Sequence, residues 1–194
     1  MVYNILSSDK DDFAIRISPK TFRTRIEFNW TPPKNFYGIA VVCNYHYLGH
    51  PVGVLHDNNL VVTQVRTAIP RPTFEIGDTV IQAGPTLVQD GKRMKRKHGF
   101  TEGFHKRNLK IGFHTYIGIT GGGSIVLGYR KHTNIRGLCE KCLAYNTKEA
   151  IKLPGLKQGG FVFNNRQTHI KIGPDVFPAA LIIEPLLKDR RNRF

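Results

Sequence analysis

Acidic residues are scarce in this 194-residue sequence, which has 14 Asp and Glu against 29 Lys and Arg and a formal net charge of +15. Because the few carboxylates form no cluster in the sequence, a dedicated cage for a hard cation such as Mg²⁺ or Ca²⁺ is not expected. We therefore expect no metal site and no cofactor. The excess of positive charge favours an anionic partner, either a small molecule such as a sugar phosphate or nucleotide, or a polyanion such as a nucleic acid.

Cysteines and long apolar segments are also few. The sequence has three Cys, an odd number, and its opening residues MVYNILSSDKDD lack the basic start and apolar stretch of a secretory signal. No apolar run approaches the roughly 20 residues of a membrane span. These features predict reduced thiols, a cytoplasmic location (the host cytoplasm if the source is viral) and no membrane partner, and they leave the oligomeric state open.

Apolar periodicity predicts a strand-rich fold. Residues 13–17 and 23–28 alternate with period two, which predicts two half-exposed strands joined as a hairpin. The continuous apolar run from Tyr37 to Cys43 predicts a strand that is buried on both faces. Further strands are predicted at 59–66, 79–83, 110–119, 124–130, 160–163, 168–172 and 179–183. The run Gly121 to Ser124 predicts a hairpin turn between two of them, although such a run also forms anion-binding loops.

One segment has helical period. After Asn134, the apolar residues fall on one helix face: Ile135, Leu138, Cys139, Cys142 and Leu143. Because no second pair of cysteines accompanies Cys139 and Cys142, we expect both to be core residues without metal. Together these elements predict an α/β or α+β fold, with residues 1–194 as a single strand-rich domain that has a mixed sheet, one main amphipathic helix and a charged tail at 188–194.

Four stretches stand in an order and at a spacing that also predict the function. They are VVCNYHYLGHPVGVLHDNNLVV, VIQAGPTLVQDGK, HTYIGIT with the following GGGSIVLGYR, and AIKLPGLKQGGFVFNN. From about residue 36 to residue 165 the chain thereby resembles the phosphodiester glycosidase family, the domain of N-acetylglucosamine-1-phosphodiester alpha-N-acetylglucosaminidases. The match is strongest at VIQAGPTLVQDGK. Four positions differ from the family pattern. His114 stands in place of an Arg, Lys152 and Pro154 replace an Asn and an Asp, and Gln158 falls where the family has a Ser.

The resemblance implies one site bordered by all four stretches. As catalytic candidates it indicates His114, His46 and Asn44, because histidine titrates near neutral pH and suits a proton relay. The substrate-binding candidates are Arg66, Gln82, Gly84, Lys152, Gly155, Lys157 and Gln158. Among them, the side chains of Arg and Lys suit phosphate oxygens. No pair of carboxylates is recognisable in the sequence, so a glycosidase with two catalytic acids is not expected.

A basic segment separates the second stretch from the third. Its candidates for contact with a polyanion are Lys92, Arg93, Lys95, Arg96, Lys97, Lys106 and Arg107, with Phe100 and Phe104 between them. The alternative is a solvated loop.

Three functions remain open on this evidence. The first is a hydrolase related to phosphodiester glycosidases that acts on a sugar phosphate, a nucleotide-like molecule or another anionic substrate. The second is a non-catalytic binder of a nucleotide, nucleic acid or phosphorylated glycan. The third is a structural or interaction protein of a bacteriophage. Turnover of a glycosyl phosphodiester separates the first from the other two.

Overall fold

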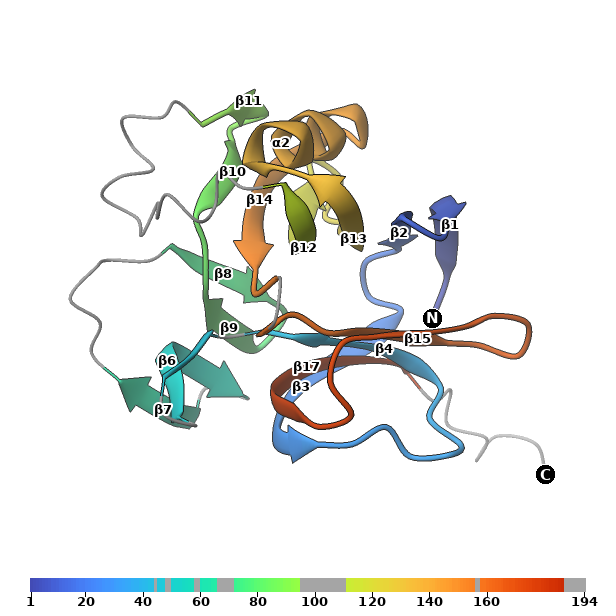
Figure 1. Ribbon diagram of the computed structural model, residues 1–194, viewed down its shortest axis with the longest axis vertical. Coiled ribbons are helices and arrows are strands. Elements are labelled where there is room, and N and C mark those ends of the chain that lie inside the picture. Colours follow the sequence, from blue (N-terminus) through green and yellow to red (C-terminus); the bar gives the residue numbers. More distant parts are fainter. Residues whose placement is uncertain are drawn as a thin grey trace.

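The protein is built from three antiparallel β-sheets and a helix that covers one of them (Figure 1). The computed structural model describes residues 1–43, 45–47, 50–57, 60–65, 72–94, 111–155 and 158–186, with only the backbone described at 45–47, 50–54, 56 and 60–65. In the first sheet the strand order is β1 (Tyr3–Asp9), β2 (Asp12–Ile17), β13 (Ile125–Thr133), β12 (Gly112–Thr120), β14 (Thr147–Leu153), β10 (Thr86–Gln89) and β11 (Lys92–Arg93).

The second sheet packs against the first, and the third adjoins both. In the second sheet the order is β16 (His169–Ile172), β15 (Phe161–Asn164), β4 (Gly38–Val42), β17 (Phe177–Pro185) and β3 (Phe22–Trp30). In the third it is β5 (Tyr45–Tyr47), β6 (His50–Asp57), β9 (Thr79–Gln82) and β8 (Thr73–Ile76), with β7 (Leu60–Val65) also paired to β6. All three sheets contribute residues to one central core, for example Ile117 from the first sheet, Val41 from the second and Phe74 from the third.

The predicted α/β or α+β class with a mixed sheet is wrong. Every strand pair in the described part of the chain is antiparallel, and one α-helix stands among these residues, so the fold is nearly all-β. The apolar run that forms β4 explains the error. In β4, Ile39 and Val41 face the central core, while Ala40 and Val42 face an outer cluster with Trp30 and Phe36. Continuous apolar strands are typical of parallel sheets covered by helices, but here another sheet and a loop cover the two faces.

The predicted hairpin of residues 13–17 and 23–28 is also wrong. Both segments are strands, but β2 pairs with β1 and β13 in the first sheet, whereas β3 pairs with β17 in the second. Half-buried alternation identifies a strand without identifying its partner. The turn predicted at Gly121 to Ser124 is confirmed, because it joins β12 to β13, and the Gly123 N–H donates to the Thr120 carbonyl at 2.9 Å.

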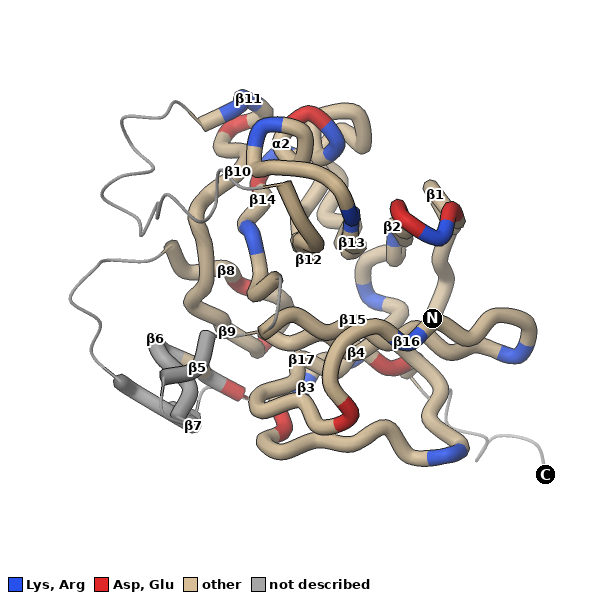
Figure 2. The backbone as a smooth tube through the Cα atoms, in the orientation of Figure 1, with Lys and Arg blue, Asp and Glu red and all other residues tan. Residues whose placement is uncertain are grey.

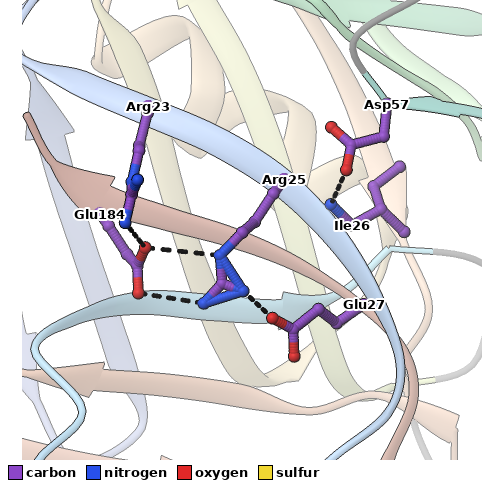
Figure 3. A network of polar contacts seen from close by, with 6 residues as sticks. All are labelled: Arg23, Arg25, Ile26, Glu27, Asp57 and Glu184. Carbon is purple, nitrogen blue, oxygen red and sulfur yellow. Dashed lines mark hydrogen bonds and ion pairs between the residues drawn. The ribbon is translucent and has the colours of Figure 1, made fainter. Parts of the chain in front are cut away.

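Polar contacts attach the third sheet to β3 (Figure 3). The Asp57 carboxylate on β6 accepts a hydrogen bond from the Ile26 N–H at 3.1 Å, which satisfies a backbone donor on this edge strand. Beside it, Arg25 forms ion pairs with Glu184 and Glu27, and the distance from Arg25 Nη2 to Glu184 Oε1 is 3.1 Å. The contact of Asp57 with β3 is thus one of the links between the third sheet and the second.

Helix α2 (Ile135–Ala144) packs on the outer face of the first sheet, where its buried residues meet Tyr116 and Ala150. The expectation that Cys139 and Cys142 are buried on a helix is confirmed, and both thiols are free. Burial raises the pKa of the Cys139 thiol to about 11, so this thiol is protonated at neutral pH. The helix has ten residues, and among the described residues no helix is long and apolar enough to cross a membrane.

Asn134 caps the start of α2, where its Oδ1 accepts a hydrogen bond from the Gly137 N–H at 3.1 Å. Asn134→Ala leaves that donor without its partner and is expected to reduce the free energy of unfolding by about 1 kcal/mol. Urea denaturation measures the change. Asn134→Ser retains a capping oxygen and should lose only a fraction of this amount, so an equal loss in both variants would show that the cap is not its cause.

Candidate active site

A cleft of about 420 Å³ lies where the third sheet meets the first. One side is formed by Thr73, Phe74 and Glu75 of β8, and the other by Ile119 of β12 with Lys148 and Glu149 of β14. A volume of this size is within the usual range for small-molecule sites, roughly 300 to 1,000 Å³. The cleft therefore has room for a sugar-sized ligand.

The cleft combines an apolar surface with charged and polar groups. Phe74 is 3% exposed and belongs to the central core, and Ile119 packs against that core. Glu75, Lys148 and Glu149 are exposed. Carboxylates accept hydrogen bonds, an ammonium group donates them, and a hydroxyl such as that of Thr73 does both. Such a surface suits a ligand that has hydroxyl groups and an apolar face.

Gln82 adjoins this cleft. It lies directly opposite Thr73 in the β8–β9 ladder, and opposed residues in an antiparallel pair project to the same side with their Cβ atoms about 5 Å apart. Gln82, which the sequence predicted to bind substrate, therefore lies beside the cleft residue Thr73.

His114, Lys152 and Gly155 meet elsewhere, at the end of β14 where β12 begins. A Cβ on Gly155 would lie 2.5 Å from the Phe113 carbonyl oxygen and 3.2 Å from His114 Nδ1, so the close approach to the Phe113 backbone requires glycine. Lys152 is 3% exposed and its ammonium group donates to the Leu153 carbonyl at 3.1 Å. His114 and Lys152 alternate with the core residues Ile117 and Leu153, which places their side chains on the helix-covered face of the first sheet.

Two further predicted residues border this buried group. The Lys152 N–H donates to the carbonyl of Pro85, the neighbour of Gly84, at 3.0 Å, and the Gln158 N–H donates to the Gly155 carbonyl at 3.2 Å. Gly84 has a φ of +154° and packs against Pro72. These contacts place Gly84, Lys152, Gly155 and Gln158 close together, with His114 completely buried among them.

The remaining predicted residues cannot be placed beside either group. Lys92 and Arg93 are exposed on β11, where Arg93 approaches Glu140 of the helix at 3.9 Å. His46 lies on β5, where only the backbone is described. Asn44, Arg66, Lys157, Lys95, Arg96, Lys97, Lys106 and Arg107 lie outside the described residues. Within the described part, Figure 2 shows Lys and Arg interleaved with Asp and Glu around α2 and at the β1–β2 turn.

The paired carboxylates of the cleft were not visible in the sequence. Glu75 follows Phe74 in a short strand, and Glu149 directly precedes the stretch that matches the last family signature, so neither belongs to a quoted signature. They line one cleft because β8 and β14, two strands in different sheets, border it from opposite sides. Among the residues that the structure describes, no three His, Cys, Asp or Glu side chains are grouped so as to hold a metal ion.

Comparison with known proteins identifies the fold. No family model matches the chain, and no curated protein matches its sequence. Among solved structures, the catalytic domain of zebrafish N-acetylglucosamine-1-phosphodiester alpha-N-acetylglucosaminidase, auto-inhibited by its pro-peptide, is similar with a TM-score of 0.71 and 12% identity over 95% of this chain and 83% of that chain. A hypothetical protein from Synechocystis is similar with a TM-score of 0.62 and 8% identity, over 93% of this chain and 61% of that one. The chain therefore has a fold like that of the zebrafish catalytic domain, as the resemblance in its sequence predicted.

Proposed function

We propose that this protein is a hydrolase that cleaves the bond between a sugar and a phosphodiester, with the 420 Å³ cleft as its active site. The observation that carries the proposal is the presence of two carboxylates, Glu75 and Glu149, in one cleft of a fold shared with a phosphodiester glycosidase domain. Hydrolysis of a glycosidic bond commonly uses two such groups, one as the acid for the leaving oxygen and one as the base or nucleophile.

The other cleft residues have complementary roles in this proposal. Ile119 contacts the apolar face of the sugar, and the Gln82 amide and the Thr73 hydroxyl bind its hydroxyl groups. The Lys148 ammonium group binds a phosphate oxygen as a point charge and stabilises the leaving phosphate. In the reaction the bond from the anomeric carbon to the phosphate oxygen breaks, the water oxygen bonds to the anomeric carbon, and a proton passes to the phosphate.

His114 has a positioning role in this proposal, because it is completely buried against Gly155 rather than exposed in the cleft. Lys152 is likewise buried, and its backbone hydrogen bond to Pro85 joins β14 to the segment that leads from Gln82. These two residues would hold the segment that presents Gln82, whereas the sequence alone made them catalytic and substrate-binding candidates. The proposed anionic substrate agrees with the net charge of +15.

The test is turnover of a methyl phosphodiester of N-acetylglucosamine 1-phosphate in ¹⁸O-labelled water. The proposal expects free N-acetylglucosamine that carries ¹⁸O at the anomeric carbon, together with unlabelled methyl phosphate. Label in the phosphate product would identify a phosphodiesterase and would contradict the proposed bond cleavage. Saturable binding of the diester without turnover would identify the non-catalytic binder, and neither binding nor turnover would favour an interaction protein.

A further inference from the structure

A second, smaller cleft of about 250 Å³ lies on the outer face of the second sheet, away from the central core. Its apolar part includes Phe36 and Val162, which belong to the outer cluster with Trp30. Its polar part consists of Lys34, His169 and Lys171, with Asn164 and Thr31 beside them. None of the described residues that line this cleft is acidic.

Two segments that are far apart in the sequence bring the basic groups together. On β16, Ile170 and Ile172 pack against the central core, so the alternating His169 and Lys171 project away from that core. Lys34 belongs to a turn in which the Phe36 N–H donates to the Pro33 carbonyl at 3.0 Å. The Asn164 amide donates to the Phe36 carbonyl at 2.7 Å and thereby attaches this turn to β15.

An internal carboxylate already contacts this basic group. Asp175 Oδ1 accepts a hydrogen bond from the Lys171 ammonium group at 2.5 Å, and the Asp175 side chain is 89% exposed. Exposed ion pairs contribute little to stability, so another anion can replace Asp175 at small cost. Counting Lys34 and Lys171 as +2 and Asp175 as −1, and taking His169 as neutral, the local charge is +1.

We propose that this cleft binds a phosphate group of a small molecule between Lys34, His169 and Lys171, and that Asp175 competes with this ligand for Lys171. Ammonium groups and an imidazole N–H donate to phosphate oxygens. Two carboxylates and one lysine line the first cleft, whereas the described lining of this one contains cationic groups and no carboxylate. The inference does not depend on the proposed hydrolase activity, since it concerns a different face of the molecule.

The proposal predicts changes of opposite sign in two kinds of variant. Lys34→Met and Lys171→Met should each weaken binding of inorganic pyrophosphate by about tenfold, because each removes a charge-assisted hydrogen bond. Asp175→Asn removes the competing carboxylate and should strengthen binding by about threefold. NMR titration of the full chain measures these affinities from the amide shifts of Asn164, His169 and Lys171, which report on this cleft alone.

Matched controls separate the site from the effect of net charge. Lys20→Met and Asp90→Asn change the same charges at exposed positions outside the cleft. The proposal is overturned if Lys34→Met and Lys171→Met bind pyrophosphate as tightly as Lys20→Met, or if Asp175→Asn binds no more tightly than Asp90→Asn. It is also overturned if the shifts at Asn164 and His169 do not saturate. Hydrolysis of the glycosyl phosphodiester serves as a separate readout, and these variants should leave it unchanged.

Discussion

Glu149→Gln is expected to lower kcat/KM for the glycosyl phosphodiester by about 10²- to 10⁴-fold, the usual contribution of a general acid or base. Glutamine retains the size of the side chain but neither donates the acid proton nor serves as a base. Glu149 is exposed in the cleft, so the substitution leaves no buried group without a partner and stability should change little. Glu75→Gln should cause a loss of the same order, because both carboxylates are needed.

The matched control is Glu140→Gln on α2. Glu140 is an exposed carboxylate that pairs with Arg136 at 3.2 Å and lies outside the cleft, so its loss should leave kcat/KM unchanged. Initial rates and the pH profile are measured for all three variants, and loss of one limb of the profile would distinguish an acid or base from a residue that only binds substrate. Full activity in Glu149→Gln would exclude the carboxylate pair from catalysis, even if turnover by the natural protein is established.

Gln82→Ala tests whether the Gln82 amide contributes to binding of the sugar. If its amide binds a sugar hydroxyl equally in the ground state and in the transition state, Gln82→Ala raises KM and leaves kcat unchanged. The fall in kcat/KM should then be about tenfold, the size expected for one hydrogen bond to an uncharged group. The split between KM and kcat therefore separates the role of Gln82 from that of the two carboxylates.

Local patterns in the sequence predicted most of the described strands and the single helix. The helix was predictable because Asn134 is a good cap and the apolar residues after it share one face. Strand β14 was missed, although Ala150 and Ile151 face different clusters and are both buried. The whole strand, Thr147 to Leu153, includes three charged residues, and one of them is the buried Lys152. Periodicity does not reveal a strand when a charged side chain occupies an inward position.

Local patterns could not predict the fold class, for a different reason. Whether β4 lies in a parallel or an antiparallel sheet depends on β15 and β17, which follow it in the sequence by more than 100 residues. The candidate site has the same long-range origin. The resemblance to a family led to Gln82, Lys152 and Gly155, but no local signal shows that Glu75 of β8 and Glu149 of β14 line the same cleft. Side chains that act together across two sheets become visible only in the folded chain.

Phe13→Ala should cause the largest loss of stability, about 3 to 5 kcal/mol in the free energy of unfolding. Phe13 is completely buried on β2 and contacts rings from both main sheets. Its centroid lies 6.1 Å from that of Tyr129 in the first sheet, and 5.6 Å and 5.3 Å from those of Phe161 and Phe163 in the second. Removing this ring therefore leaves a cavity between the two sheets and also removes favourable contacts between aromatic rings.

Urea denaturation of Phe13→Ala and of the control Phe28→Ala measures this difference. Phe28 lies on β3 and is 40% exposed, so its truncation should cost less than about 1.5 kcal/mol. Domains of this size have total stabilities of about 5 to 15 kcal/mol. If Phe13→Ala does not fold in full, Phe13→Leu, which retains most of the apolar volume, provides the measurement with a smaller loss. Equal losses for truncation at Phe13 and Phe28, or a Phe13→Leu variant as stable as the natural protein, would contradict the packing of the two sheets around Phe13.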